Sequence, residues 1–434
     1  LSLVRAILAI APHTRMVEFE SREHPPRTDA GHRINVSPSS ITDPPTRQRL
    51  SFGSAAVRDH LLDVRFTGSG SEYFRIWIVN LLLMLVTLSL YYPWAKVRKL
   101  RYFLGNTLVD GQPLDFHGSP MKMLRGYLLV GVLLVLYSVA GNFSPEAGLA
   151  AFVIVAAIWP ALLKSSIRFR LANTSWRGLR FRFSGTVGGA YRAVLPLFVP
   201  GLLIVAALVG VPDQEHPPMW YAAFAGAVTL LTLLVVPWLW FNLKRYQHQN
   251  YCLGQLQTEL RTNAWAFYKV FLKTLGVFLL VLVLILAVLF GLWGAALPSL
   301  MPGRTGAGMA AVFLAALLAG LIGLLALQIV PRPYFTSRMQ NLLWSRTGNR
   351  VMRFRSKLKF RPLLALTIKN WLLMLLTLGL YWPFAAVAVT RMRLHAVSVV
   401  TRVDPAELLD DARAAEGEAA GDAAGDLFGL DVGL

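Results

Sequence analysis

Long apolar blocks alternate with basic segments over most of this chain. The blocks lie at 76–95, 124–141, 147–164, 191–211, 219–241, 268–297, 308–331 and 364–385. None of them contains an Asp or Glu residue. An α-helix needs about 20 apolar residues to cross a hydrocarbon core of ~30 Å, and the blocks from the second to the seventh reach or approach that length. The pattern therefore predicts six transmembrane helices.

The connections between the blocks alternate in charge. Basic segments follow the first, third, fifth and seventh blocks, whereas the connections after the second, fourth and sixth blocks carry at most one Lys or Arg. Lys and Arg accumulate in cytoplasmic loops of membrane proteins. The six helices are therefore expected to form three hairpins, with the basic segments in the cytoplasm.

The first and last blocks, 76–95 and 364–385, have two interpretations. If both cross the membrane, the two ends of the membrane domain lie outside, together with bases such as Arg75 and Arg391. If both re-enter the cytoplasmic leaflet, those bases stay inside. The apolar length favours crossing and the charge favours re-entry, so the sequence leaves both interpretations open.

Composition supports a membrane protein and divides the chain into three parts. The mean hydropathy is +0.51 and charged residues make up 15% of the chain, against roughly 25% in soluble proteins. Residues 1–60 are rich in Pro, Ser and Arg, and residues 403–434 are acidic. Both segments are predicted to be disordered because they lack a periodic apolar pattern, and the multi-pass domain is expected at 61–402.

The net charge of +20 suits either nucleic acid or an anionic membrane surface. The bases flank apolar blocks that are too long for soluble core helices. We therefore expect membrane lipids with anionic headgroups as partners on the cytoplasmic side, and no nucleic acid. The single cysteine, Cys252, excludes an intramolecular disulfide and a multi-cysteine metal site.

Several stretches of the chain resemble one another. Residues 80–101 match 370–391 at a constant offset, residues 92–118 match 159–185 without a gap, and a weaker copy lies at 236–250. In the fullest copy an apolar helix ends at an aromatic–Pro–aromatic sequence, a basic amphipathic stretch follows, and a turn leads into a short segment with strand periodicity. The predicted fold class is an all-α polytopic membrane protein with internal repeats, six transmembrane helices, two outer hydrophobic segments and short cytoplasmic β-strands.

The first copy resembles the YjgN-like family of bacterial inner-membrane proteins. The resemblance is carried by the segments YFRIWIVN at 73–80, TLSLYYPWAKVR at 87–98 and RYFLGNT at 101–107, and by the return of TLGLYWPF at 377–384. It covers about 61–402. The resemblance implies a multi-pass protein of the bacterial inner membrane. The molecular function of that family is not established, so the resemblance supplies no catalytic or ligand residues.

Polar residues inside apolar blocks are candidates for function. Asn80 and Thr87 recur in the last copy as Asn370 and Thr377. Such side chains either bind a substrate or ion, or form hydrogen bonds between helices worth about 0.6 to 2 kcal/mol each. No carboxylate lies in a block, which argues against a proton relay built on Asp or Glu.

Juxtamembrane bases are candidates for binding anionic lipid headgroups, at about 1 kcal/mol per base. The candidates recur near the same place in the copies: Lys96, Arg98, Arg101, Arg168 and Arg245. In the last copy Ala386 and Ala388 replace the first two, so that copy lacks them. The alternative is that these bases only set the topology.

No catalytic motif of the common hydrolase, nucleotide-binding or zinc-protease types is present. We therefore expect no enzymatic activity, no cofactor and no metal. The expected function is a transporter-like or channel-like protein. The alternative is a structural protein that binds anionic lipid and organises the membrane.

Overall fold

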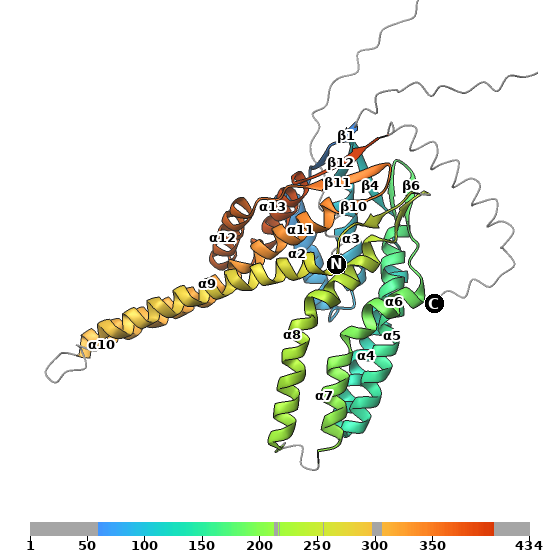
Figure 1. The fold of residues 1–434 in the computed structure, drawn as a ribbon. Helices are drawn as coiled ribbons and strands as arrows, with labels where there is room; N and C mark the ends of the chain where they lie inside the picture. Colours follow the sequence, from blue (N-terminus) through green and yellow to red (C-terminus); the bar gives the residue numbers. More distant parts are fainter. Residues whose placement is uncertain (1–59, 212–215, 217, 255, 297–305, 403–434) are drawn as a thin grey trace, which may run out of the picture.

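The computed structural model describes residues 60–211, 216, 218–254, 256–296 and 306–402. Short strands lie together at one end of the molecule, and helical hairpins extend away from them (Figure 1). Except for His60, the two segments that were predicted to be disordered lie outside the described residues.

The described residues contain twelve strands of two to five residues each. They are β1 (His60–Leu62), β2 (Val64–Phe66), β3 (Thr107–Val109), β4 (Gln112–Phe116), β5 (Thr174–Trp176), β6 (Leu179–Phe183), β7 (Tyr251–Leu253), β8 (Leu256–Gln257), β9 (Glu259–Leu260), β10 (Thr347–Gly348), β11 (Met352–Ser356) and β12 (Val397–Thr401). One sheet has the order β2-β3-β4-β5-β6-β7-β8 and the other β1-β12-β11-β10-β9. A single residue separates β1 from β2, and another separates β8 from β9, so the chain joins the two sheets at both ends.

The helices occur between the strands in chain order. They are α2 (Gly70–Val86), α3 (Tyr92–Gly105), α4 (Pro120–Phe143), α5 (Pro145–Ala172), α6 (Val187–Val194), the 3-10 turn η1 (Leu195–Leu197), α7 (Val199–Val209), α8 (Met219–His248), α9 (Ala264–Ala296), α10 (Gly306–Ile329), α11 (Pro331–Ser345), α12 (Phe360–Leu376) and α13 (Trp382–His395). Each group of helices that leaves the strands therefore returns to them.

The strand before each group of helices pairs with the strand after it. These antiparallel pairs are β2 with β3, β4 with β5, β6 with β7, β9 with β10, and β11 with β12. In each pair the residue that follows the first strand donates its backbone N–H to the carbonyl at the end of the returning helix. The donors and acceptors are Thr67 and Asn106, His117 and Asn173, Ser184 and Asn250, Arg261 and Arg346, and Lys357 and Ala396. The same closure thus recurs at the base of every group.

The two sheets enclose a common apolar core. Phe66, Leu114 and Leu179 from the larger sheet pack in one cluster with Leu62 and Val399 from the smaller sheet. Burial of such side chains stabilises the fold by about 1.5–3 kcal/mol each. The twelve strands β1–β12 therefore belong to one folded unit, called here the strand ring.

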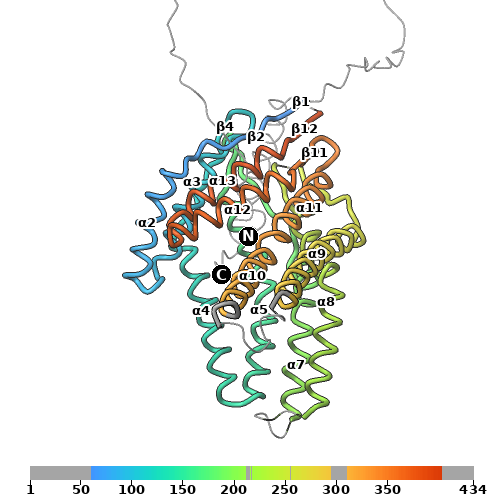
Figure 2. The backbone as a smooth tube through the Cα atoms, turned by 90° about the vertical axis from the view of Figure 1, so that its left-hand side faces the viewer, coloured from blue at the N-terminus to red at the C-terminus, as the bar shows by residue number. Residues whose placement is uncertain are grey.

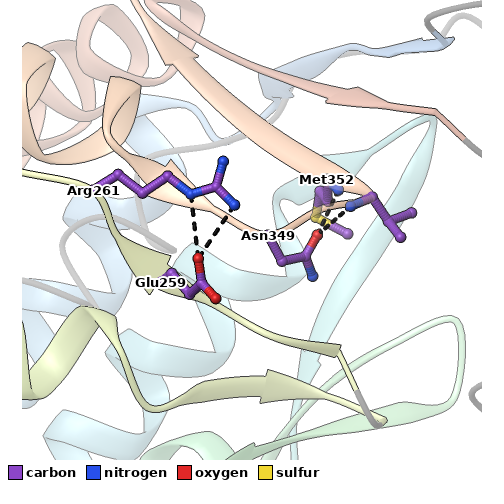
Figure 3. A network of polar contacts seen from close by, with 5 residues as sticks. Glu259, Arg261, Asn349 and Met352 are labelled. Atoms are coloured by element: carbon purple, nitrogen blue, oxygen red, sulfur yellow. Dashed lines mark hydrogen bonds and ion pairs between the residues drawn. The ribbon is translucent and has the colours of Figure 1, made fainter.

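Polar contacts stabilise the turn between β10 and β11, next to strand β9 (Figure 3). Asn349, in the turn between β10 and β11, accepts hydrogen bonds from the backbone N–H groups of Val351 and Met352 at 2.9 and 2.6 Å. On the neighbouring strand the guanidinium group of Arg261 lies 3.2 Å from a carboxylate oxygen of Glu259.

The strands were predicted as short pieces, but here they form two sheets. The all-α class therefore describes only the helical part, because the loops between hairpins pair with one another.

Among the described residues, five helices are long and apolar enough to cross a membrane. They are Pro120–Phe143, Pro145–Ala172, Met219–His248, Ala264–Gly294 and Ala310–Ser345. At most 17% of the residues in their apolar windows are buried, so their side chains face the surroundings. The block 191–211 differs, because α7 is bent by 55° from the helical segment that precedes it. Pro196 and Pro200 lie at this bend, where each removes a backbone N–H donor.

The blocks 76–95 and 364–385 are not continuous helices. Between α2 and α3, Leu88 and Ser89 have φ angles of 48° and 70°. Between α12 and α13, Leu378 and Gly379 have φ angles of 49° and 89°. An α-helix cannot run through left-handed residues, so each block folds into two shorter helices. Figure 2 shows that these helices end well before the tips of α4, α5, α7 and α8.

The hairpins do not form one parallel bundle. Helices α4, α5, α7 and α8 run side by side, whereas α9 and α10 extend in a different direction from the same strand ring (Figures 1 and 2). Near the ring α9 packs on α8, where Phe267 stacks edge-on against Phe241 at 5.4 Å. The base of α9 is thus fixed against α8. Its apolar length packs along α10, where Gly323 lies against Ile285, and this pair of helices extends away from the other spans.

Candidate functional site

The two candidate threonines of the outer apolar blocks, Thr87 and Thr377, lie at the helix breaks. The hydroxyl of Thr87 donates to the carbonyl of Leu83 at 2.7 Å and accepts from the backbone N–H of Tyr91 at 3.0 Å. Thr377 makes the same two bonds, with Leu373 and Tyr381, at the same distances. Both hydroxyls therefore satisfy backbone groups that the break would leave unpaired, which is a structural role.

The two candidate asparagines of the outer apolar blocks differ from each other in their hydrogen bonds. Asn80 is 5% exposed, and its Oδ1 accepts a long hydrogen bond of 3.5 Å from Arg98. Asn370 is 3% exposed, and neither polar atom of its side chain has a partner. Ala388 stands where the first copy has Arg98. The last copy therefore has no donor equivalent to Arg98 for the Oδ1 atom of Asn370, and Nδ2 of that residue has no partner either.

Three of the predicted headgroup residues occupy one repeated position. Arg101, Arg168 and Arg245 each lie five residues before the asparagine that ends the helix. All three are exposed. None of the three side chains makes a hydrogen bond or an ion pair with another residue in the described part of the chain; the ion pairs found there are Arg65 with Asp63, Arg177 with Asp110, and Arg261 with Glu259. Their charges face the surroundings at the ring end of α3, α5 and α8.

The other two predicted headgroup residues, Lys96 and Arg98, contact neighbouring side chains. Lys96 is partly buried, and its ammonium group lies 5.5 Å from the centre of the Tyr92 ring. Burial, together with the positive charge of Arg170, lowers the pKa of Lys96 from its ordinary value. Arg98 lies over the ring of Tyr91 at 5.6 Å as well as against Asn80. Lys96 is thus less available to a headgroup, whereas Arg98 is exposed like the three arginines. Of those three, Arg245 also lies over a ring, that of Phe241, at 6.0 Å.

Two further bases gather with Arg168 around a cavity. Lys164, Arg168 and Arg182 line it together with Thr186 and Cys252. The sequence pattern placed Lys164 and Arg182 in basic segments but did not indicate that they meet. Lys164 and Arg168 are four residues apart on one helix, and this spacing predicts that their side chains lie close together. The approach of Arg182 depends instead on the pairing of β6 with its neighbouring strands, which the sequence pattern does not contain.

A lysine is buried, which the sequence pattern did not predict. Lys244 is 3% exposed, and its ammonium group donates to the side chain of Gln247 at 2.9 Å. In the described residues no three His, Cys, Asp or Glu side chains come together as metal ligands.

The apolar helices, the basic helix ends and the strand ring define a multi-pass membrane protein. Residues 61–427 match a family described as bacterial proteins of unknown function (DUF898), and the chain belongs to that family.

Curated relatives share part of this chain. "Inner membrane protein YjgN" of Salmonella typhimurium (strain LT2) is 32% identical over 145 residues, which cover 33% of this chain and 36% of the relative. The protein of the same name from Escherichia coli (strain K12) is 27% identical over 142 residues, covering 32% of this chain and 35% of the relative. The chain thus spans about a third of the length of the curated relatives it matches. No solved structure matches it.

Proposed function

We propose that this protein is a non-enzymatic protein of the bacterial inner membrane that binds anionic phospholipid headgroups through arginines on its cytoplasmic side. The relatives are named as inner membrane proteins, and this chain has several helices of membrane length. These two findings confirm the predicted multi-pass inner-membrane location.

Helix length and composition allow six spans, and placing all six in one bilayer requires the α9–α10 hairpin to turn from its direction in Figure 1 to that of the other hairpins. The six spans consist of α4, α5, the bent pair α6 and α7, α8, α9 and α10. Since every group of helices begins and ends at the strand ring, the ring lies on one side of the membrane, and its basic helix ends favour the cytoplasm. The pairs α2–α3 and α12–α13 then re-enter the cytoplasmic leaflet, which keeps Arg75 and Arg391 inside.

The repeated position of Arg101, Arg168 and Arg245 carries the proposal. Three exposed arginines without hydrogen-bond or ion-pair partners in the described chain lie at the ring end of three helices. Each base near an anionic leaflet contributes about 1 kcal/mol, so three favour anionic over neutral lipid by roughly a hundredfold in total. A role in topology alone does not require all three side chains to be exposed and unpaired.

The test measures which lipids surround the protein. The full chain is extracted from bacterial membranes in polymer nanodiscs, and the ratio of phosphatidylglycerol to phosphatidylethanolamine is compared with that of the bulk membrane. We expect enrichment of phosphatidylglycerol that the double variant Arg101→Gln/Arg245→Gln reduces. The matched control is Arg353→Gln/Arg355→Gln, which removes the same charge from exposed positions of strand β11. Equal enrichment in all three proteins would exclude the proposal.

A transporter-like or channel-like protein is the second candidate. Asn370 supports it, because a buried amide without a partner can accept a polar solute at membrane depth. Planar-bilayer recordings of the reconstituted full chain test this candidate. It requires a conductance that Asn370→Leu abolishes and Asn80→Leu alters less; a silent wild-type protein argues against a channel.

A further inference from the structure

The cavity between α5 and strands β6 and β7 has an unusual lining. It has a volume of about 580 Å³, which is within the range of small-molecule pockets. Lys164 and Arg168 reach it from α5, Arg182 from β6, and Ser184 and Thr186 from the segment that begins α6. None of the residues that line it is Asp or Glu.

The three bases do not compensate one another. Like charges that share a cavity repel each other unless an anion or water screens them. Lys164 and Arg168 make no hydrogen bond or ion pair within the described part of the chain. Arg182 donates from Nη2 to the backbone carbonyl of Gly254 at 2.9 Å, which holds the guanidinium group without neutralising its charge.

The backbone around the cavity is well fixed. Arg182 is opposite Cys252 in the pairing of β6 with β7. A Cβ atom on Gly185 would lie 2.5 Å from the Phe183 ring and 2.8 Å from the Tyr246 hydroxyl, so the chain approaches closely here because this residue is glycine. Thr186 then caps α6 by accepting from the N–H of Gly189 at 3.1 Å. The positive end of this helix dipole adds to the charge of the three bases.

We propose that this cavity binds a phosphate group held by Lys164, Arg168 and Arg182. Arg168 and Arg182 have planar guanidinium groups that suit phosphate oxygens, and Lys164 adds a point charge. Lys164 ends the apolar block of α5, so the cavity lies at the depth of lipid headgroups. The inference deepens the proposed function and rests on its membrane orientation. A phospholipid headgroup and free inorganic phosphate share this chemistry.

The experiment uses the delipidated full chain in an uncharged detergent. Native mass spectrometry counts the phosphatidylglycerol molecules that remain bound at increasing lipid concentration, and calorimetry measures binding of inorganic phosphate. The variant is Lys164→Gln/Arg168→Gln, and Lys164→Arg/Arg168→Lys keeps the charge. Arg192→Gln/Arg180→Gln is the matched control, because it removes two exposed neighbouring arginines that do not line the cavity.

We expect one tightly bound phosphatidylglycerol per chain, with affinity that falls roughly thirtyfold in the glutamine variant and is retained in the other two. If only the binding of inorganic phosphate follows this pattern, the site is supported and its ligand is soluble phosphate rather than a lipid headgroup. If both affinities are the same in wild type and the glutamine variant, the proposal is overturned. Thermal unfolding shows whether each variant is folded. If the glutamine variant is unfolded, the affinity of the variant Lys164→Arg/Arg168→Lys is compared with that of the wild type instead, and loss of binding in this folded, equally charged protein overturns the proposal.

The two proposals fail separately. Arg101 and Arg245, which test the general enrichment of anionic lipid, do not line the cavity. Loss of enrichment in their double variant with no change at the cavity supports the proposed function alone. The reverse result supports the cavity alone.

Discussion

Three glycines follow a phenylalanine by two positions and lie where the ring of that phenylalanine occupies the space that a Cβ atom would need. A Cβ on Gly118 would lie 2.4 Å from the Phe116 ring, and Gly185 meets Phe183 in the same way at 2.5 Å. The same Phe-x-Gly sequence occurs at Gly68, where the Phe66 ring and the Tyr102 hydroxyl lie at 2.9 and 2.8 Å. Each of these sequences closes a strand against the start of a helix. The match of residues 92–118 with 159–185 pairs two of these sequences, but only the structure shows the steric reason.

Gly118→Ala is therefore expected to destabilise the protein by about 1–3 kcal/mol, because the new methyl group must displace a buried ring. Gly126→Ala is the matched control: nothing lies within 4 Å of its Cβ position in α4, and alanine favours a helix over glycine by about 1 kcal/mol. Thermal unfolding of both variants in detergent measures the difference. Equal shifts for the two would contradict the steric explanation.

The two asparagines allow a second prediction at the residue scale. Asn370→Leu removes a buried amide that has no partner, so stability should stay the same or rise by about 1 kcal/mol. Asn80→Leu removes the acceptor of Arg98 and should lower stability by about 1 kcal/mol. Chemical unfolding of the two variants measures the direction in which each substitution changes the free energy of unfolding. A larger loss at Asn370 would mean that its amide has a partner such as a bound solute.

At the scale of elements, the breaks in the outer blocks depend on hydroxyl groups. Thr87→Val leaves the N–H of Tyr91 without its acceptor, and a loss of about 1–3 kcal/mol is expected. Thr229→Val is the control, since that hydroxyl only donates to the carbonyl of Ala225 within α8. Thermal unfolding compares the two. If both variants lose the same stability, the hydroxyl of Thr87 does not support the break.

Neighbouring hairpin turns contact each other through one charge pair. Asp110 and Arg177 occupy equivalent places in the first two copies, where both have positive φ angles of 53° and 51°. The carboxylate of Asp110 forms an ion pair with the guanidinium group of its own equivalent, Arg177, at 2.7 Å. Side-by-side packing of repeated turns explains why the two residues have opposite charge.

At the scale of the molecule, the strand ring brings distant parts of the chain together. β1 pairs with β12, so His60 lies opposite Thr401. Since the helical groups also return to the ring, both ends of the membrane domain are expected on the same side of the membrane.

Cysteine labelling in intact cells tests this topology. Starting from a Cys252→Ala chain, Asn142→Cys at the far end of α4 should react with an impermeant maleimide added outside. Ser89→Cys in the first break and Arg402→Cys after β12 should react only after the cells are opened or the membrane is dissolved. Labelling of Ser89→Cys from outside would show that this block crosses the membrane.

The sequence by itself determined the membrane class, the apolar blocks, the alternating charge and the repeated arginines. These features depend on local composition and on the length of a helix relative to the bilayer, which a linear pattern contains. It also located both outer blocks, but it could not choose between crossing and re-entry, because a broken and a continuous apolar helix have the same hydrophobicity.

Only the tertiary structure decided the rest. The pairing of β1 with β12, the meeting of Lys164 and Arg168 with Arg182, and the lack of a partner for Asn370 all depend on contacts between residues far apart in the chain. Such contacts follow from how the strands pair and enclose a shared core, and no local period encodes them. The basic charge was thus visible in the sequence, whereas its concentration in one cavity was a property of the fold.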